Sequence, residues 1–446
     1  MIVVAGNPGT GKTMLCGAFL HHGALQGENG LYVSFSEGRE TFISNMRRFG
    51  LDFESTRSNR VEILDFITSK EPGVDAIMEM ITERIEVNRA ERLVIDSFTA
   101  MAHAFPSLID ERVVLHILSK IVRTTGCTTI LVTEVPTGRQ TIGTGIEEFI
   151  VDGIIIARRR MLDGSVLREL ETIKMRGTIT EHPRQVFSLH RGFTVFEPFS
   201  VPHIDEPRPY IGQLEEHGRY STGSPDLNAI TGGYGHGDTV YVETGRNTAQ
   251  GAPRLLLGPL LANSLTNGMG VLLIPTCGQD ADCVINWISE YGVDSEASSR
   301  LMKVAEIGNH QAEGGTGFPL DPDDVKLSHR MWNEKKRRLV EETGRPVLKL
   351  INIDMLGVHW PLEPTRRLLE TEAKLTRSEG GLLVLVSGPG EGALHGDISN
   401  MSNVHIRLDM QGGVVLLHGI RPRTPLHAVE STGEKGYPAL KLTQIS

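Results

Sequence analysis

Short runs of apolar residues alternate with longer segments in which apolar residues recur every three or four positions. The short runs have the length of buried strands, and the longer segments have the period of helices. Strands are predicted at 2–5, 30–37, 61–65, 92–97 and 128–134, with helices at about 12–26, 74–88 and 111–125. Strands that alternate with helices in this way are typical of an α/β module with a mostly parallel sheet.

Two later segments follow this pattern. Residues 150–157 and 167–176 are predicted as a pair of strands around a turn at Asp163-Gly164, a dipeptide that favours hairpin turns. Residues 197–220 are rich in proline, histidine and glutamate, which is typical of a linker. We therefore expect a first module over 1–200, a linker over 201–220 and a second module over 221–446.

The second half repeats the strand pattern of the first half. Its apolar runs fall at 239–245, 270–276, 350–354, 382–387 and 418–423, and they follow one another in the same order as the strands of the first half. Repetition on this scale indicates tandem copies of one unit. The predicted fold is α/β, with two tandem modules that each have a mostly parallel central sheet.

The first predicted strand leads directly into a glycine-rich loop and then into a helix. The loop has the Walker A pattern and consists of Gly6, Asn7, Pro8, Gly9, Thr10, Gly11, Lys12 and Thr13. Glycines let successive backbone N–H groups face phosphate oxygens, and the helix start adds its positive end. In this pattern the lysine contacts the β- and γ-phosphates and the hydroxyl contacts Mg²⁺. The loop predicts binding of ATP and Mg²⁺, and the alternative is a chance glycine-rich turn.

Carboxylates stand at the ends of two predicted strands. Asp96 ends an apolar strand in the Walker B manner and is predicted to hold Mg²⁺ together with Thr13. Glu37 follows another strand, and the carboxyl ends of parallel strands line the ligand crevice of such sheets. We expect Glu37 to face the nucleotide. The alternative is a carboxylate at the start of the next helix.

Cations near the predicted hairpin are further candidates. Alternation along a strand places Lys174 and Arg176 on one face, where they suit a phosphate, including one held by a neighbouring subunit. A solvated edge pair is the alternative. The triplet Arg158-Arg159-Arg160 is interpreted as solvated, with nucleic-acid contact as the alternative.

The second copy of the loop lacks the phosphate-binding residues. It runs from Gly245 to Pro253 without a lysine or a following Ser or Thr, and proline has no N–H to offer a phosphate. The position of Glu37 falls on Cys277 or Gln279, and neither can serve as a base for water. This half is therefore interpreted as a pseudo-ATPase.

Some polar residues remain in the second half. Asp354 stands near the end of the strand that answers the Asp96 strand, and Arg421 and Arg423 stand where the first half has its strand-end cations. The two arginines are expected to complete the ATP-hydrolysing site of a neighbouring chain or to bind an anion between modules. A solvated strand end is the alternative.

Together these residues resemble the KaiC-like branch of the RecA-fold ATPases, over essentially the whole chain. In that family a pair of glutamates follows the strand after the first helix, and one acts on the attacking water. Here the pair reads Ser36-Glu37, so the resemblance gives this role to Glu37. The family's Lys-Leu-Arg-Gly, whose cations reach the γ-phosphate of the adjacent subunit, looks like Lys174 to Gly177. The stretch from Gly145 to Asp152 is similar to a family segment near the subunit boundary.

The resemblance implies a homo-oligomer, as a ring or a filament. In KaiC itself the second module phosphorylates itself on an adjacent Ser and Thr, near the place of Ser399-Asn400 here. Because the second loop is degenerate, autokinase activity is not expected.

Composition narrows the classes of function. Hydrophobic residues at 39% and charged residues at 22% suit a globular chain, and no stretch approaches the ~18 apolar residues of a membrane span. The four cysteines form no C-x-x-C pair, which favours reduced thiols and a cytoplasmic setting. A net charge of −10 and only 5% aromatic residues disfavour a general nucleic-acid-binding protein.

We expect Mg²⁺-dependent ATP binding with slow hydrolysis in an oligomer that has a regulatory role and an unidentified protein partner. One alternative is a DNA recombination or repair accessory of the RecA/RadA type, supported only by Arg158–Arg160 and Lys335–Arg338. The other alternative is a scaffold that binds ATP without turnover, which Ser36 favours.

Overall fold

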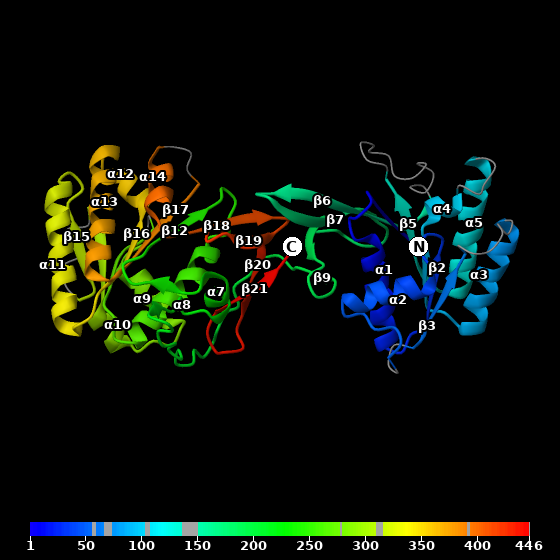
Figure 1. The fold of residues 1–446 in the computed structure, drawn as a ribbon, viewed down its shortest axis with the longest axis horizontal. Coiled ribbons are helices and arrows are strands. Elements are labelled where there is room, and N and C mark those ends of the chain that lie inside the picture. Colours follow the sequence, from blue (N-terminus) through cyan, green and yellow to red (C-terminus); the bar gives the residue numbers. More distant parts are fainter. Residues whose placement is uncertain are drawn as a thin grey trace. The chain divides into compact units, whose positions relative to one another are not determined.

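The computed structural model describes residues 1–55, 59–66, 74–102, 108–135, 150–276, 279–308, 315–389 and 393–445. The chain separates into two compact units, Met1–Glu197 with Ile445–Ser446, and Pro198–Gln444. Figure 1 shows that each unit is built on a central sheet with helices packed against it. No helix in the described ranges is long and apolar enough to cross a membrane.

The first unit alternates strands and helices before it ends in antiparallel strands. Its strands are β1 (Ile2–Gly6), β2 (Gly30–Ser34), β3 (Val61–Asp65), β4 (Arg92–Asp96), β5 (Thr128–Glu134), β6 (Gly153–Leu162), β7 (Ser165–Met175), β8 (Arg184–Ser188) and β9 (Thr194–Val195). Its helices are α1 (Lys12–Leu25), α2 (Arg39–Arg48), α3 (Val74–Asn88), α4 (Phe98–Ala102) and α5 (Leu108–Thr125). In the described residues these strands form one sheet in the order β3-β2-β4-β5-β1-β6-β7-β8-β9.

Helices cover both faces of this sheet. Successive strand residues point to opposite faces, so Val4 packs with α1 and α2 while Val3 packs with α3, α4 and α5. The central strand β1 is parallel to both of its neighbours, β5 and β6. The loop that follows β1 therefore emerges at the carboxyl ends of several buried parallel strands, which is where such sheets bind ligands.

The second unit has the same arrangement. Its strands are β10 (Arg219–Tyr220), β11 (Tyr234–Gly235), β12 (Thr239–Thr244), β13 (Val271–Ile274), β14 (Met302–Ile307), β15 (Gly317–Leu320), β16 (Leu348–Asn352), β17 (Leu382–Ser387), β18 (Val404–Gln411), β19 (Val414–Arg421), β20 (His427–Thr432) and β21 (Ala439–Gln444). Its helices are α7 (Pro225–Thr231), α8 (Gly251–Thr266), α9 (Ala281–Ser289), α10 (Ser295–Leu301), α11 (Val325–Thr343), α12 (Ile353–His359), α13 (Leu362–Glu379) and α14 (Ala393–Met401).

The two large sheets match strand for strand. The second sheet has the order β15-β14-β13-β16-β17-β12-β18-β19-β20-β21. If β12 is placed on β1 and the others follow, the order equals that of the first sheet with β15 added at one edge. Both sheets are mixed and mostly parallel in their inner part. The predicted α/β fold with a repeated unit is therefore confirmed.

The hairpin of the first unit is longer than predicted. The prediction ended the first strand at 157 and began the second at 167, whereas β6 and β7 continue to Leu162 and Ser165. Asp163 and Gly164 form a two-residue turn with positive φ angles of 47° and 80°. Such turns match the twist of the paired strands, so the ladder continues up to the turn.

The proline- and histidine-rich stretch from 201 to 220 belongs to the second compact unit. There the ring of Tyr210 lies 5.1 Å from that of Tyr437 and is buried in a small aromatic cluster that includes Tyr291.

Two predictions fall on residues that the structure does not describe. Of the segment from Gly145 to Asp152, residues 145–149 lie outside the described residues, as does Cys277.

Candidate functional site

Three glycines shape the loop that follows β1. A Cβ atom at Gly6 would lie 2.4 Å from the carbonyl oxygen of Ala157, so no larger residue fits there without a shift of the loop. Gly9 and Gly11 have φ angles of 75° and 101°, a conformation that glycine adopts without strain. In the described part of the chain, the N–H groups of Gly9, Thr10, Gly11 and Lys12 donate to no acceptor. Backbone N–H groups without an acceptor at the start of a helix form an anion-binding site.

Lys12 is folded back over the loop. Its Nζ donates to the carbonyl oxygens of Gly6 and Asn7, at 2.8 and 3.0 Å, and the residue is 8% exposed. Burial lowers the pKa of the Lys12 ammonium, while the charges of Glu134 and Asp96 act in the opposite direction. The ammonium is thus held by weak neutral acceptors that a phosphate can replace.

Side chains within the loop fix its shape. The Thr10 hydroxyl donates to the carbonyl of Asn7 at 2.9 Å, and the Asn7 amide donates to the carbonyl of Val135 at 2.8 Å. The second of these bonds ties the loop to the segment after β5. The loop is therefore preorganised.

Asp96 joins three elements at the carboxyl edge of the sheet. It ends β4 and is 5% exposed, and its Oδ2 accepts from the Thr13 hydroxyl at 2.8 Å and from the Tyr32 hydroxyl at 2.9 Å. Burial raises the pKa of the Asp96 carboxyl, whereas the hydrogen bonds from Thr13 and Tyr32 and the charge of Lys12 lower it. Hydroxyl and carboxylate oxygens are ligands that Mg²⁺ prefers. The residues present therefore fit a magnesium site.

Tyr32 was not among the predicted site residues. It lies on β2, fully buried, with its ring stacked 4.0 Å from the ring of Phe42. In the sequence it reads as one more apolar strand position. Only the pairing of β2 with β4 shows that its hydroxyl lies beside the Asp96 carboxylate.

Glu37 lies in the turn between β2 and α2 and is half-buried. Its Oε2 accepts from the Asn45 amide at 3.2 Å, and its backbone is fixed by the hydroxyl of Ser34. Burial raises the pKa of the Glu37 carboxyl, and the charge of Asp96 adds to the rise, while the bond from Asn45 opposes it. A raised pKa strengthens a carboxylate as a general base.

The arginine triplet on β6 does not act as one group. Arg158 pairs with Glu171 at 2.6 Å and Arg160 pairs with Glu169 at 2.9 Å. Arg159 points the other way, since a Cβ atom at Gly9 would lie 3.6 Å from its Nη1. The prediction treated all three as solvated, because spacing alone does not show which side of a hairpin faces the loop.

A second cation faces Arg159 across the hairpin. Arg159 is directly opposite Arg168 on β7, and like charges in this position are destabilising. Burial lowers the pKa of the Arg168 guanidinium, and the charge of Arg159 lowers it further. In the described residues, Arg168 Nε is buried without a hydrogen-bond partner. This positive region beside the loop suits an anion.

Lys174 and Arg176 lie near the amino end of β1, whereas the loop follows the carboxyl end of this strand. Met175 is paired with Gly153, which lies beside Ile2 at the start of β1, whereas the loop follows Gly6 at its end. At about 3.3 Å per residue these ends are roughly 13 Å apart. Lys174 donates to the Val151 carbonyl at 2.8 Å, and Arg176 lies 3.5 Å from Asp152.

The corresponding edge of the second unit differs at its key positions. Asp96 is the last residue of β4, and the last residue of the matching strand β16 is Asn352 rather than Asp354, which lies on α12. The sequence-based match to Asp354 was therefore two positions out of register.

Arg421 donates to the carbonyls of Ser399 and Ser402 at 3.1 and 2.6 Å, so it holds the end of α14 in place.

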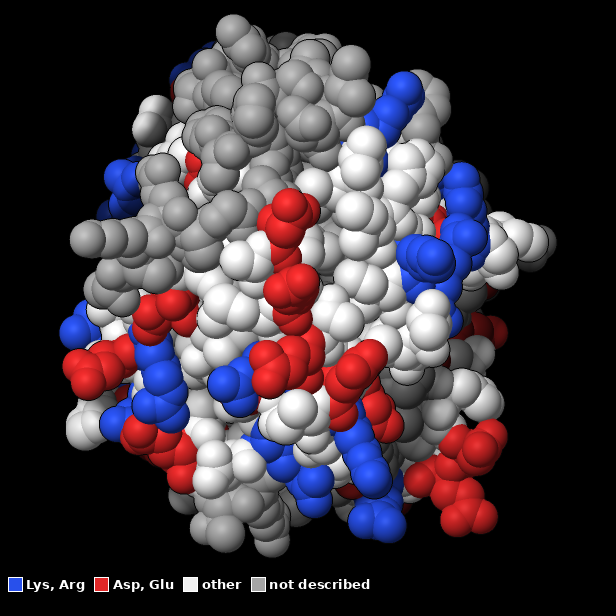
Figure 2. Space-filling model, turned by 90° about the vertical axis from the view of Figure 1, so that its right-hand side faces the viewer, with Lys and Arg blue, Asp and Glu red and all other residues white. Residues whose placement is uncertain are grey.

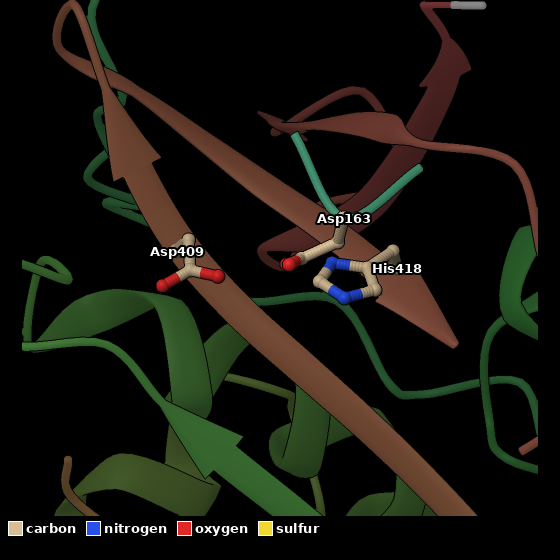
Figure 3. A group of neighbouring side chains, drawn as sticks. All are labelled: Asp163, Asp409 and His418. Carbon is tan, nitrogen blue, oxygen red and sulfur yellow. The ribbon is translucent and has the colours of Figure 1, made fainter. Parts of the chain in front are cut away.

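Acidic and histidine side chains also occur on the hairpin strands. Figure 3 shows Asp409 on β18 and His418 on β19 of the second unit, and Asp163 in the β6–β7 turn of the first unit. We assign no metal site to these three side chains, because they come from two separate units.

The mostly parallel sheets and the loop between β1 and α1, with Asp96 hydrogen-bonded to Thr13, define a P-loop ATPase with RecA-like modules. A family model described as "ATPase: KaiC" matches residues 1–198. UPF0273 protein PH0284 of Pyrococcus horikoshii is 30% identical over 44% of this chain and 85% of its own length. The chain belongs to the KaiC family of ATPases.

Other relatives match different shares of the chain. Protein GvpD2 of Halobacterium salinarum is 25% identical over 100% of this chain and 93% of its own length. The circadian clock oscillator protein KaiC of Prochlorococcus marinus is 28% identical over 54% of this chain, and the match spans only 48% of that protein.

Proposed function

We propose that the first unit binds ATP with Mg²⁺ and hydrolyses it slowly, and that this cycle regulates a homo-oligomeric ring or filament. In this proposal residues 1–200 form the active module and residues 221–446 form a degenerate module, and residues 201–220, which belong to the second compact unit, lead from one to the other. The observation that carries the proposal is the Thr13–Asp96 hydrogen bond of 2.8 Å beside a loop whose N–H groups have no acceptor in the described residues.

Each site residue has a role that its position supports. The loop N–H groups and Lys12 bind the phosphates, and Lys12 stabilises charge on the transferred phosphoryl group. Thr13 and Asp96 hold Mg²⁺, which neutralises phosphate charge when it is bound. Glu37 orients and deprotonates the attacking water, and the rise in its pKa on burial suits that role.

Lys174 and Arg176 act in trans in this proposal. Because they lie at the amino end of β1, roughly 13 Å from the loop by strand rise, they cannot reach phosphates bound in their own module. Trans-acting cations of this kind can raise the rate about 10³-fold or more. They also make turnover depend on assembly, which is what a regulatory switch requires.

Mixing two inactive variants tests the trans assignment. Lys12→Ala removes the loop lysine, and the double variant Lys174→Ala, Arg176→Ala removes the cations. If the cations act in trans, an equal mixture of the two should regain about a quarter of wild-type turnover, because random assembly restores that share of sites. If they act only within their own chain, the mixture stays inactive.

The main test measures ATP hydrolysis with and without single-stranded DNA, and particle mass by light scattering in ATP and in ADP. We expect slow hydrolysis that DNA does not change, and a larger mass in ATP. Glu37→Gln should reduce turnover by about 10²-fold or more, as is typical for loss of a general base. Glu40→Gln is the matched control, because Glu40 is exposed in the first turn of α2.

The ATP-binding scaffold is the second candidate. The substitution of Ser36 for one glutamate of the family pair favours it, and so does the bond between Asn45 and the Glu37 carboxylate. Tight ATP binding without turnover in the wild type would establish the scaffold and refute hydrolysis. Loss of binding in Lys12→Ala would confirm that the site is the same.

DNA binding has less support from the charged surface. Lys336 and Arg338 pair with Glu379 and Glu334 at 2.6 and 2.5 Å. Figure 2 shows one face of the first unit, over α3 and α5, where cationic and anionic side chains are mixed. Paired charges give little counterion release. Strong stimulation of hydrolysis by DNA would nevertheless decide for the recombination accessory.

A further inference from the structure

The second unit has a cavity where the first unit has its loop site. The cavity has a volume of about 290 Å³ and lies at the carboxyl ends of four parallel strands, where Thr244, Thr276, Asn352 and Ser387 line it. Ligand pockets of proteins begin at about 300 Å³. The degenerate module has therefore kept a space of ligand size at the edge where such sheets bind ligands.

The groups that would hold a magnesium nucleotide are replaced one by one. Asn352 ends β16 as Asp96 ends β4, so a neutral amide stands where the carboxylate was. Tyr32 is paired with Val94, which lies two residues before Asp96. In the same way, Leu273 is paired with Leu350, which lies two residues before Asn352. Leu273 therefore occupies the position of Tyr32, and an alkyl side chain replaces the hydroxyl that contacts Asp96.

The start of the following helix has changed in the same way. Lys12 is the first residue of α1, whereas Gly251 is the first residue of α8 and Ala252 follows it. The lysine and the magnesium-binding hydroxyl are thus both lost. All four replacements remove charge or hydrogen-bonding capacity.

The loop after β12 is tied to the neighbouring strand β18. The N–H of Gly245 and the hydroxyl of Thr248 both donate to the carbonyl of Leu408, at 2.7 and 3.1 Å. The start of α8 is also covered, because a Cβ atom at Gly251 would lie 3.2 Å from Val201 and 3.6 Å from Phe199. The loop is therefore held against β18, and the start of α8 has little room for a phosphate.

The cavity is lined mainly by apolar side chains. They come from α8, α9 and the ends of the inner strands, and include Leu257, Leu261, Leu273, Val284, Trp287 and Val386. Arg254 is exposed and also lines the cavity, so it stands at the mouth, with its guanidinium 5.9 Å from the Trp287 ring centroid. Asp354 lines the cavity too, and its carboxylate accepts from the Gly388 N–H at 2.5 Å.

We propose that the second unit binds a small, largely apolar molecule with one anionic group, in place of a nucleotide. The apolar body lies among the leucine and valine side chains and against Trp287. The anionic group lies at the mouth, beside the Arg254 guanidinium. The degenerate module is in this view a ligand-sensing unit attached to an ATPase, and its site does not depend on turnover in the first unit.

The dye 1-anilinonaphthalene-8-sulfonate has this chemistry and serves as the probe. Bound in the cavity, it should accept excitation energy from Trp287, so binding is followed by quenching of tryptophan emission in the full chain. We expect one saturable site per chain. Trp287→Phe should lower the energy transfer, because Trp287 lines the cavity, whereas the other two tryptophans, Trp332 and Trp360, are buried in a separate cluster on the opposite face of the sheet.

Two substitutions locate the site. Gln279→Phe places a ring into the cavity that Gln279 lines and should weaken dye binding about tenfold, the loss expected for about 1.4 kcal/mol of contact. Asn286→Phe is the matched control, because Asn286 is exposed on α9 outside the cavity lining, and binding should stay unchanged. Arg254→Gln should weaken binding severalfold through loss of the anion contact. Circular dichroism checks the fold of each variant, and Arg254→Gln tests the site if Gln279→Phe does not fold.

Three results would overturn the proposal. The first is the absence of saturable dye binding to the wild-type chain, and the second is equal binding by Gln279→Phe and Asn286→Phe. The third is displacement of the dye by MgATP in the Lys12→Ala chain, which would show that the second unit takes nucleotide. None of these readouts requires ATP hydrolysis, so failure of the proposed ATPase function would leave this test intact.

Discussion

Arg159 provides the sharpest test of how the first unit binds phosphate. It stands beside Gly9, since a Cβ atom there would lie 3.6 Å from Nη1, while its neighbour Arg158 is paired with Glu171 at 2.6 Å. Arg159→Gln removes the charge next to the loop. Arg158→Gln removes one charge from the same triplet on the other side of the strand and is therefore the matched control.

The magnitude follows from Coulomb's law. A guanidinium about 5 Å from a phosphate charge, in surroundings with an effective dielectric constant of about 20, contributes roughly 3 kcal/mol. Arg159 is exposed, so solvent screening reduces this to at most about 1 kcal/mol. ATP should therefore bind up to about fivefold more weakly to Arg159→Gln. Thermal stability should not fall, because the substitution also removes the repulsion from Arg168 directly opposite.

The assay is a titration with a fluorescent ATP analogue in the presence of Mg²⁺, repeated at two salt concentrations. The difference between wild type and Arg159→Gln should shrink at high salt, because the interaction is between charges near the surface. Equal affinities for wild type and Arg159→Gln would refute this reasoning. An equal loss in Arg158→Gln would also refute it, since the effect would then belong to the triplet as a whole.

Three further outcomes are expected. Tyr32→Phe removes a donor to Asp96, worth about 1 kcal/mol, and should raise the Mg²⁺ concentration for half-maximal hydrolysis severalfold in a magnesium titration. Because burial raises the pKa of Glu37, hydrolysis should increase with pH through a midpoint above 4.5, and the residual rate of Glu37→Gln should lack this step. Although burial opposes ionisation, His329 and Lys349 hold the pKa of Glu372 at about 2, below its ordinary 4.5. Ionised Glu372 therefore adds up to about 3 kcal/mol to the free energy of unfolding above pH 4.5. This contribution is lost as the pH falls toward 2. Urea unfolding should show this loss in the wild type and not in Glu372→Gln.

The buried pair behind the last prediction could not be found from the sequence. Lys349 reads as a polar interruption in the apolar run of β16, and Glu372 as one of many charged residues of α13. The structure places their charged groups 2.6 Å apart, with both side chains almost completely buried. The helix packing that brings them together depends on many distant residues, which no local pattern contains.

The candidate site was predicted where its residues are consecutive or follow a strand. The loop from Gly6 to Thr13 is one continuous motif, and Asp96 and Glu37 follow recognisable apolar runs. These are local features, because a phosphate loop needs a particular backbone path that only certain neighbouring residues allow. Tyr32 and Arg159 were missed because their roles depend on which residues face them across the sheet.

The sequence by itself determined the order of strands and helices, the repetition of the unit and the loop with its phosphate chemistry. The reason is that the period of apolar positions and the conformational limits of glycine and proline act along the chain. Tertiary structure decided the rest. Strand register placed Asn352, rather than Asp354, at the position in the second unit that corresponds to Asp96. The turn of one hairpin directed Arg159 toward the loop and its two neighbours toward glutamates. A shift of one residue in register moves every side chain to the other face, so such contacts are settled only when the strands pair.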